Sequence, residues 1–554
     1  MQHLVHDIQI APKLIKAKPT INAKDPSSVD DRADFLAAAV SDLSDRDAHL
    51  FNAFGAGPAV TPRFSTIIRG FLNFATLTPD AIAAECEGAT ITYGALDAAA
   101  NRLASILQNH GVGRGDAVCI YLQRSIPMLV GIIAAMKLGA PYVPQHVGVA
   151  PPASLKHISK VVDAKVILTV SGLADQVPVA YGKTLIRIDT VMFDPALNST
   201  PPTSRANIAR PDDTCIMLFT SGTTGVPNGV QVTHRNLCNI LQTAPGDMGI
   251  KPGTRVAQIL SIAFDMAAWE ILGCLSNGGT LLIRGKNIQE TAQRADVLIA
   301  TPSILNTLDA DRCRQIKTAA VAGEPCPRPL ADLWGGFCTF YNSCGPTETT
   351  IINTAEQHLP EKDRLTIGRP TPNNTVYILD ENLRPLPIGE KGEMWAGGDC
   401  VTAGYLDNGA LNGERYRPDP FLGGVRKMFR TRDIGRWTDT GELEHFGRVD
   451  DLVKIRGFRV ELDGVSAILE ATADCEQAVT VKYDNQNLAA FVSPTSVNTV
   501  SASERLRKAL PYYCVPAVVL ALDTLPRTPR GKIDKRALLQ LAKSHVETTG
   551  QELN

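Results

Sequence analysis

The stretch Cys215-Ile-Met-Leu-Phe-Thr-Ser-Gly-Thr-Thr-Gly-Val-Pro-Asn-Gly-Val-Gln-Val-Thr-His234 joins an apolar strand to a loop of glycines and hydroxyl residues. Glycine accepts positive φ, so such a loop can turn several backbone N–H groups toward one point, and the hydroxyls add donors to the same anion site. The loop therefore predicts a phosphate site, with an ordinary surface loop as the alternative. A P-loop is excluded because no Gly-Lys-Ser/Thr follows. The residues expected to hold phosphate are Thr220, Ser221, Gly222, Thr223, Thr224 and Gly225.

The composition is typical of a soluble globular enzyme with several folding units. The chain has 554 residues, 44% of them hydrophobic, and a net charge of −2. That charge gives no basic field for nucleic acid and no polybasic patch for a membrane. The 12 cysteines lack Cys-x-x-Cys spacing, which argues against a zinc site or a disulfide framework. Without a signal-peptide core or a bilayer-length apolar run, we expect a cytoplasmic protein.

Strand and helix patterns alternate along most of the chain, which predicts parallel sheets with helices on their faces. The section 373–393 has short strands and turns instead, and the end of the chain has a small α+β pattern. We therefore expect an α/β protein with an N-terminal extension or linker (1–60), a large domain of two α/β subdomains and a β-barrel-like section (61–449), and a small mobile α+β C-terminal domain (450–554). The clearest expected elements are a helix at 126–137 and strands at 117–122, 166–169, 280–283, 297–300, 318–322 and 337–341.

A second motif, Asn342-Ser-Cys-Gly-Pro-Thr-Glu348, follows the strand expected at 337–341. A nucleoside triphosphate needs donors for its oxygens and a carboxylate for the Mg²⁺ that accompanies it, and Thr347 and Glu348 can supply both. Alone, Gly-Pro-Thr-Glu would be a turn into a helix, because Pro suits the first helical turn and Glu complements the helix dipole.

Ten motifs in this order resemble the adenylate-forming superfamily, and within it the amino-acid adenylation domains of nonribosomal peptide synthetases. The resemblance implies that a substrate carboxylate attacks ATP to give aminoacyl-AMP and pyrophosphate, and that a phosphopantetheine thiol on a separate carrier protein then takes the acyl group. The motifs are Ile91–Leu96, Met136–Pro144, the glycine loop, Phe264-Asp265, Tyr341–Glu348, Gly392–Gly398, Phe429–Asp433, Gly447–Gly457, Leu510–Pro516 and Thr528–Asp534.

The resemblance also implies roles for single residues. Lys532 is the cation, on a mobile loop, that reaches the substrate carboxylate and ATP, while Thr347 and Glu348 act at the phosphates and the metal. Asp433 accepts the ribose hydroxyls, as two carboxylate oxygens can, with Asn342 and Arg448 as further nucleotide-binding residues. Asp450 is the hinge of the small domain, and Lys454 is presented to the site in the second half-reaction.

Asp265 is the residue that indicates an amino-acid substrate, because in the resembling domains this aspartate pairs with the α-ammonium. A desolvated carboxylate needs such a partner; the alternative is that Asp265 only caps a helix. The small side chains of Ala320, Ala322 and Ser343 predict a bulky substrate, aromatic or resembling N-acylated hydroxyornithine as in fungal siderophore synthetases. The remaining residues implied for this pocket are Met266, Trp269, Ile299, Ile351 and Ile352.

Three positions depart from the pattern of the resembling domains. Asn228 stands where a lysine is usual, Cys344 where an aromatic residue is usual, and Arg432 where a glycine is usual. We expect activity with weaker ATP binding. Two alternatives are an acyl- or aryl-CoA ligase of the same fold, against which Asp265 argues, and a nucleotide-binding domain without catalysis. No Gly-Gly-Xaa-Ser carrier motif occurs, so we expect the attacking thiol to come from a separate carrier domain. We also expect a neighbouring condensation domain as a partner, and a monomeric chain.

Overall fold

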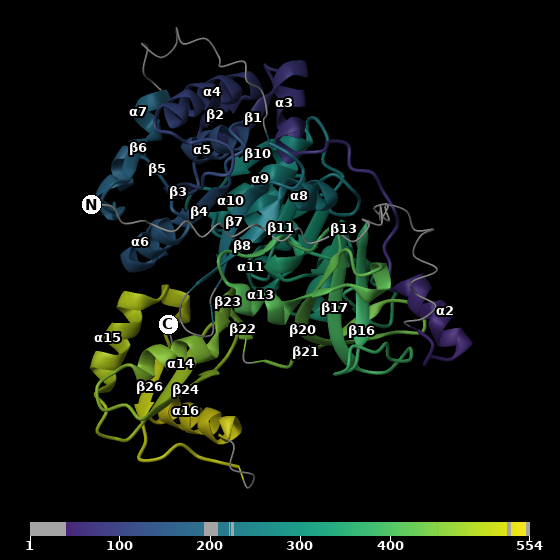
Figure 1. Ribbon diagram of the computed structural model, residues 1–554, viewed down its shortest axis with the longest axis vertical. Coiled ribbons are helices and arrows are strands. Elements are labelled where there is room, and N and C mark those ends of the chain that lie inside the picture. Colours follow the sequence, from purple (N-terminus) through teal and green to yellow (C-terminus); the bar gives the residue numbers. More distant parts are fainter. Residues whose placement is uncertain are drawn as a thin grey trace, which may run out of the picture.

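The structure is a computed structural model that describes residues 40–192, 209–220, 222, 227–450, 452–528 and 533–549. Two large mixed sheets form its body (Figure 1). The seven-stranded sheet has the spatial order β18 (Gly404–Tyr405), β8 (Asn228–Thr233), β7 (Thr214–Thr220), β4 (Tyr142–His146), β3 (Val118–Leu122), β5 (Val166–Thr169) and β6 (Thr184–Arg187). The nine-stranded sheet has the order β15 (Arg369–Pro370), β14 (Thr354–His358), β13 (Thr339–Cys344), β12 (Thr318–Val321), β11 (Val297–Ala300), β9 (Arg255–Gln258), β10 (Thr280–Ile283), β1 (Ile82–Cys86) and β2 (Ala89–Thr92).

The central strands of both sheets pair in parallel, as the alternating pattern predicts. Helices connect these strands, and α5 (Ile126–Lys137) packs between the two sheets. Its residues 128–136 are all buried, and the helix contacts β3 and β4 of one sheet and β1 of the other. A helix buried on every side lies inside the core rather than on its surface. The other helices of the body are α3 (Ile67–Leu77), α4 (Tyr93–Asn109), α6 (Pro152–Val161), α7 (Ile188–Met192), α8 (His234–Leu241), α9 (Asp265–Ser276), α10 (Ile288–Ala292), α11 (Pro302–Leu305), α12 (Arg328–Gly335) and α13 (Gly409–Arg415).

Strand β13 is longer than the sequence pattern indicates. It was expected to end at residue 341 but continues to Cys344, because Asn342 to Cys344 pair with Thr354 to Glu356 of β14. Asn342 and Ser343 are therefore strand residues at the carboxyl end of a central strand. In open α/β sheets this edge is where ligands bind.

The section expected to be barrel-like is a five-stranded antiparallel sheet. Its order is β16 (Asn374–Leu379), β17 (Gly392–Gly398), β20 (Lys427–Trp437) and β19 (Tyr416–Pro418), with β21 (Leu443–Arg448) also paired to β20. It lies below the two mixed sheets in Figure 1. Strand β20 carries Asp433, and β21 ends at Arg448, so this sheet supplies one wall of the site.

Residues 45–56 fall within the extension or linker expected for residues 1–60, and they pack on the body of the protein. They form helix α2 (Asp45–Phe54) and a bridge from Ala56 to Thr375 of β16. The buried Phe51 ring stacks on Tyr377 at 5.8 Å and contacts Phe421 at 5.3 Å. Burial of an aromatic ring contributes on the order of 2–3 kcal/mol, which explains why this segment packs on the sheet.

A small α+β unit follows residue 451, as predicted. It consists of the hairpin β22 (Leu452–Ile455) and β23 (Phe458–Glu461), helices α14 (Leu462–Glu470), α15 (Thr499–Ala509) and α16 (Lys535–Thr549), and the sheet β24 (Gln477–Lys482), β25 (Leu488–Ser493) and β26 (Val518–Ala521). It has its own apolar clusters, and the hairpin reaches back to the body, where Phe458 packs on Phe264 at 4.5 Å. Across the described ranges, no helix is both long and apolar enough to cross a bilayer.

Candidate active site

A cavity of about 920 Å³ lies between the end of β13 and the start of the small unit. Its walls come from β13, the Gly345-Pro346-Thr347 turn, β20, β21 and the hairpin β22–β23. The residues from the sequence prediction that line it are Asn342, Ser343, Cys344, Thr347, Asp433, Arg448, Asp450 and Lys454. The structure thus brings together motifs from widely separated parts of the chain.

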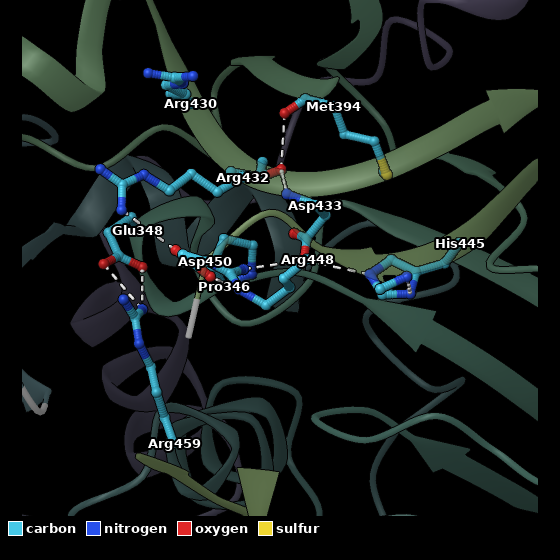
Figure 2. Close-up of polar contacts among 12 residues, drawn as sticks. Pro346, Glu348, Met394, Arg430, Arg432, Asp433, His445, Arg448, Asp450 and Arg459 are labelled. Carbon is cyan, nitrogen blue, oxygen red and sulfur yellow. Dashed lines mark hydrogen bonds and ion pairs between the residues drawn. The ribbon is translucent and has the colours of Figure 1, made fainter. Parts of the chain in front are cut away.

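Asp433 is one of the acidic residues in the wall of this cavity. Arg448 donates from Nη1 to Asp433 Oδ1 at 2.9 Å, and His445 Nε2 lies 3.2 Å from the same oxygen (Figure 2). Burial alone raises its pKa, yet His445 and Arg448 hold the pKa of Asp433 below its usual value. Asp433 is therefore an ionised acceptor with one oxygen already in use. The sequence reasoning missed His445, which precedes the Gly447-Arg448 pair by two residues on β21.

Arg448 also pairs with the predicted hinge residue Asp450, at 2.7 Å and 2.9 Å. A second arginine, Arg432, joins the same carboxylate at 3.4 Å and pairs with Glu414 of α13. Arg432 has φ of +63°, in the left-handed region that favours glycine. This explains why a glycine suits the position, whereas the arginine side chain here joins Glu414 of α13 to Asp450.

Glu348 lies in a short 3₁₀ turn, Thr347–Thr349, and its side chain is fully buried. Tyr405 donates to its Oε1 at 2.7 Å, and Arg459 of β23 donates to both carboxylate oxygens, at 3.0 Å and 2.9 Å (Figure 2). Burial raises the pKa of Glu348, but Arg459, then Arg415 and Tyr405, outweigh it and hold the pKa at about 2. Sequence reasoning missed Arg459 and Tyr405, since each lies just beyond a motif that was assigned.

Asp265 is the first residue of α9 rather than its N-cap, which is Phe264. The helix-cap alternative in its simple form is therefore wrong, although the carboxylate accepts the N–H of Met266 at 2.7 Å. It also accepts the Thr347 hydroxyl at 2.8 Å. Burial raises the pKa of Asp265, and the ammonium of Lys454 opposes that rise. Burial likewise lowers the pKa of Lys454, so each residue offsets the desolvation of the other.

The predicted substrate pocket is small in this structure. Asp265, Met266, Ala322, Ile351 and Lys454 line a cavity of about 20 Å³, enough for roughly one water molecule. The hairpin turn fills the remaining space, because Gly457 lies so close to Thr301 that a Cβ there would come within 2.8 Å of its Cγ2. With the hairpin in this position, the pocket thus has no room for the bulky substrate expected from the sequence.

The other predicted pocket residues lie around this cavity without lining it. Ile299 and Ala320 are buried partners on β11 and β12, and Ile352 packs against Gly345. Trp269 is buried in α9 and donates its indole N–H to the Gly246 carbonyl at 2.6 Å.

Only part of the glycine loop is described. Thr220 and Gly222 line a second cavity, of about 310 Å³, together with Asp265, Thr347 and Lys454. Ser221, Thr223, Thr224 and Gly225 lie outside the described residues, and so does Lys532. Asn228, the residue in place of a lysine, accepts a hydrogen bond from the Asn408 side chain at 3.1 Å.

Residues of both units line this second cavity. From the body it is lined by residues such as Gln145, His157 and Phe264, and from the small unit by residues such as Val465 and Tyr513. Asp265 and Lys454 line both this cavity and the small one of about 20 Å³, so the two cavities adjoin.

Comparison with known proteins identifies the class. Residues 71–406 match the family model described as AMP-binding enzyme, and the chain belongs to this family. Among its relatives, Adenylate-forming reductase 06235 of Coprinopsis cinerea is 42% identical over 506 residues, which cover 91% of this chain and 49% of the relative. Bacitracin synthase 3 of Bacillus licheniformis is 33% identical over 491 residues, which cover 86% of this chain and 8% of the relative. The chain thus spans about half, or much less, of the length of these relatives.

Solved structures support the same fold. The Vibrio cholerae adenylation domain AlmE in complex with glycyl-adenosine-5'-phosphate superposes with a TM-score of 0.75 at 20% identity, covering 88% of this chain and 99% of that one. NpsA-ThdA, an artificially fused adenylation–PCP di-domain from Klebsiella oxytoca, gives 0.73 at 22% identity, covering 88% and 97%. The resemblance to adenylate-forming enzymes of the nonribosomal-synthetase type is confirmed.

Proposed function

We propose that the chain activates an amino acid as aminoacyl-AMP and transfers the aminoacyl group to a carrier-protein phosphopantetheine thiol. The observation that carries this proposal is the position of Asp265. This residue lines both the small substrate pocket and the second cavity, and its carboxylate accepts a hydrogen bond from Thr347, which we assign to the nucleotide. A desolvated carboxylate at that point suits the α-ammonium of an amino acid.

In the first half-reaction, a substrate carboxylate oxygen forms a bond to the α-phosphorus of ATP while the bond to the bridging oxygen breaks, and pyrophosphate leaves. Asp433 would accept the ribose hydroxyls, Thr347 would donate to phosphate oxygens, and Lys532 would offset the charge of the two approaching anions. The glycine loop would hold the phosphates through backbone and hydroxyl donors.

Mg²⁺ would be held by Glu348. In the part of the chain that the structure describes, no group of three or more His, Cys, Asp or Glu could hold a metal alone. A single carboxylate nevertheless fits Mg²⁺, which binds to one or two carboxylates and to substrate phosphates rather than to a cage of protein ligands. The metal would supply charge neutralisation at the phosphates.

In the second half-reaction, a thiol sulfur attacks the acyl carbonyl carbon, the bond to the AMP oxygen breaks, and the thiol proton passes to solvent. The second cavity supports this step, because residues of both units line it and it includes Lys454 and Asp265, where the thiol arm would have to arrive. We infer that rotation about Asp450 alternates between the two half-reactions, and that the hairpin carrying Lys454 is in place for the second one.

For the substrate, Met266, Ala322 and Ile351 offer an apolar end without a counter-charge. We propose a bulky amino acid, aromatic or of the N-acylated hydroxyornithine type found in siderophores, which enters when the hairpin withdraws. We also propose cytoplasmic monomers that work with carrier and condensation domains.

A second candidate concerns the fate of the thioester. The relatives named adenylate-forming reductases are 42% and 41% identical over 91% of this chain, against 33% for the bacitracin synthase relative. This favours a carrier-bound acyl group that is released by reduction to an aldehyde, with hydride from a nicotinamide cofactor on a module outside this chain.

The test of the proposed function is ATP–pyrophosphate exchange by the whole chain over the amino acids, ornithine derivatives, and aryl and fatty acids. Exchange with one amino acid or a few is expected. Exchange only with acids that lack an amino group, followed by AMP release that depends on coenzyme A, would establish the CoA-ligase alternative instead. ATP binding without exchange would show a non-catalytic domain.

A further inference from the structure

Arg432 joins three segments of the chain beside the proposed hinge. Its Nη1 lies 3.4 Å from Oδ2 of Asp450 (Figure 2). Its Nη2 pairs with Glu414 of α13, and its backbone carbonyl accepts the N–H of Val449 at 3.0 Å. The backbone and the side chain of one residue on β20 are thus bonded to the last two described residues before the small unit.

Asp450 is also held from a second direction. Arg448 donates to both of its carboxylate oxygens, at 2.7 Å and 2.9 Å, and is itself bonded to Asp433 at 2.9 Å. Arg448 lines the nucleotide cavity, so a nucleotide bound there would compete for its guanidinium. Arg432 is not among the described residues that line this cavity, so its contact with Asp450 would remain when the cavity is filled.

We propose that Arg432 is a positioning residue that clamps Asp450 to the body, so that the small unit turns about the bonds that follow the Asp450 Cα atom. This proposal rests on the proposed function, in which the small unit rotates between two half-reactions. A side chain branches from Cα before the Cα–C bond, and the backbone has only two soft dihedrals per residue. Fixing the carboxylate and the Val449 N–H therefore leaves ψ of Asp450 as the first free rotation.

The conformation of Arg432 supports this role. Its φ of +63° lies in the left-handed region, where a residue with a side chain is less stable than glycine. Strained residues of this kind persist where surrounding contacts hold them, and here those contacts are the carboxylates of Glu414 and Asp450. The arginine therefore serves the contact with the hinge residue rather than the stability of its own strand.

Loss of the clamp would free rotations that precede the pivot. The small unit would then sample more orientations, and the orientation that presents Lys532 to the phosphates would be populated less. The first half-reaction should slow, whereas the binding of substrates, which Arg432 does not touch, should stay the same. One partly buried ion pair corresponds to about two- to fivefold in such an equilibrium.

The experiment digests the whole folded chain with endoproteinase Asp-N, which cuts before aspartate, and follows the cut before residue 450 or 451 by mass spectrometry. For both Arg432→Gly and Arg432→Ala we expect this cut to be about two- to fivefold faster than in wild type, since cleavage follows the population of locally opened chain. Pyrophosphate exchange with the preferred amino acid should show kcat lowered by a similar factor and an unchanged KM for ATP. Arg430→Gln is the matched control and should behave as wild type, since it removes an arginine of the same strand whose partner is Glu393.

The two variants separate the clamp from stability, because glycine relieves the strained φ and alanine keeps it. Equal effects in both variants support the clamp. Unchanged cleavage or unchanged kcat in both, or an effect that appears only in the alanine variant together with a lower melting temperature, would overturn it. If neither variant folds, Glu414→Gln frees the guanidinium from its outer partner and should raise cleavage about twofold, with no rise as the refuting result. Wild-type protein without exchange over the whole panel refutes adenylation instead, whereas cleavage is measured without turnover.

Discussion

The backbone conformation of Arg432 predicts which of two replacements, glycine or alanine, gives the more stable protein. Its φ of +63° costs a non-glycine residue on the order of 1–2 kcal/mol. Its partners Glu414 and Asp450 are 43% and 14% exposed, so each pair contributes about 0.5–1 kcal/mol. Arg432→Gly loses the pairs and some chain entropy but gains the relief of strain, so its stability should stay within about 1 kcal/mol of wild type. Arg432→Ala loses the pairs and keeps the strain.

The alanine variant should therefore be less stable than the glycine variant by about 1 kcal/mol, the opposite of the usual order in a strand. Urea unfolding followed by tryptophan fluorescence provides the comparison. Arg430 is the matched control, because it lies on the same strand, pairs with Glu393, and has ordinary backbone angles, so alanine should be the more stable variant there. If alanine is at least as stable as glycine at position 432, the strain argument is refuted.

Three further results are expected. Lys454→Ala should slow thioester formation about 10²-fold while pyrophosphate exchange stays within about threefold, as for loss of one cation that acts in a single step; an equal loss in both assays would contradict its assignment to the second. Cys344→Tyr places a ring in the wall of the nucleotide cavity and should lower KM for ATP roughly two- to tenfold through stacking, and a raised KM would show that adenine lies elsewhere. Burial lowers the pKa of His146 and of His234 to about 4, so the folded state binds fewer protons than the unfolded state below pH 6.5. The free energy of unfolding should therefore fall as the pH falls from 6.5 to 4. If the variant with both His146→Gln and His234→Gln loses stability with pH as steeply as wild type does, these histidines are not the cause.

Much of the fold could be predicted because its elements have strong local patterns. The strands at 166–169, 280–283 and 297–300 and the helix at 126–137 have the predicted bounds, since the length of each apolar run separates strands from helices. The N-terminal helix α2 was missed because its burial depends on Phe51 meeting a sheet more than 300 residues away. A local pattern has no information on such a contact.

The candidate site could also be predicted only in part, because sequence motifs are local whereas some contacts of the site are not. Asp433, Arg448 and Asp450 belong to sequence motifs and are in contact in the structure, but the link from Glu348 to Arg459 spans 111 residues and depends on how two units meet. The pocket is smaller with the hairpin in this position than the side-chain volumes predict, because the backbone also takes up space. Ile351 has φ of +73°, and the hairpin turn at Gly457 takes up the remaining space.

The central claim is that Asp265 recognises an α-ammonium group. Its most direct test is pyrophosphate exchange by wild type and Asp265→Asn, each with the preferred amino acid and with the same acid lacking its amino group. Loss of a desolvated charge pair costs about 2–5 kcal/mol, so wild type should prefer the amino acid by roughly 30-fold or more, and the variant should lose most of that preference. Asp212→Asn, in an exposed pair with Arg235, should behave as wild type. Equal use of both acids by wild type, or an undiminished preference in the variant, would contradict the account.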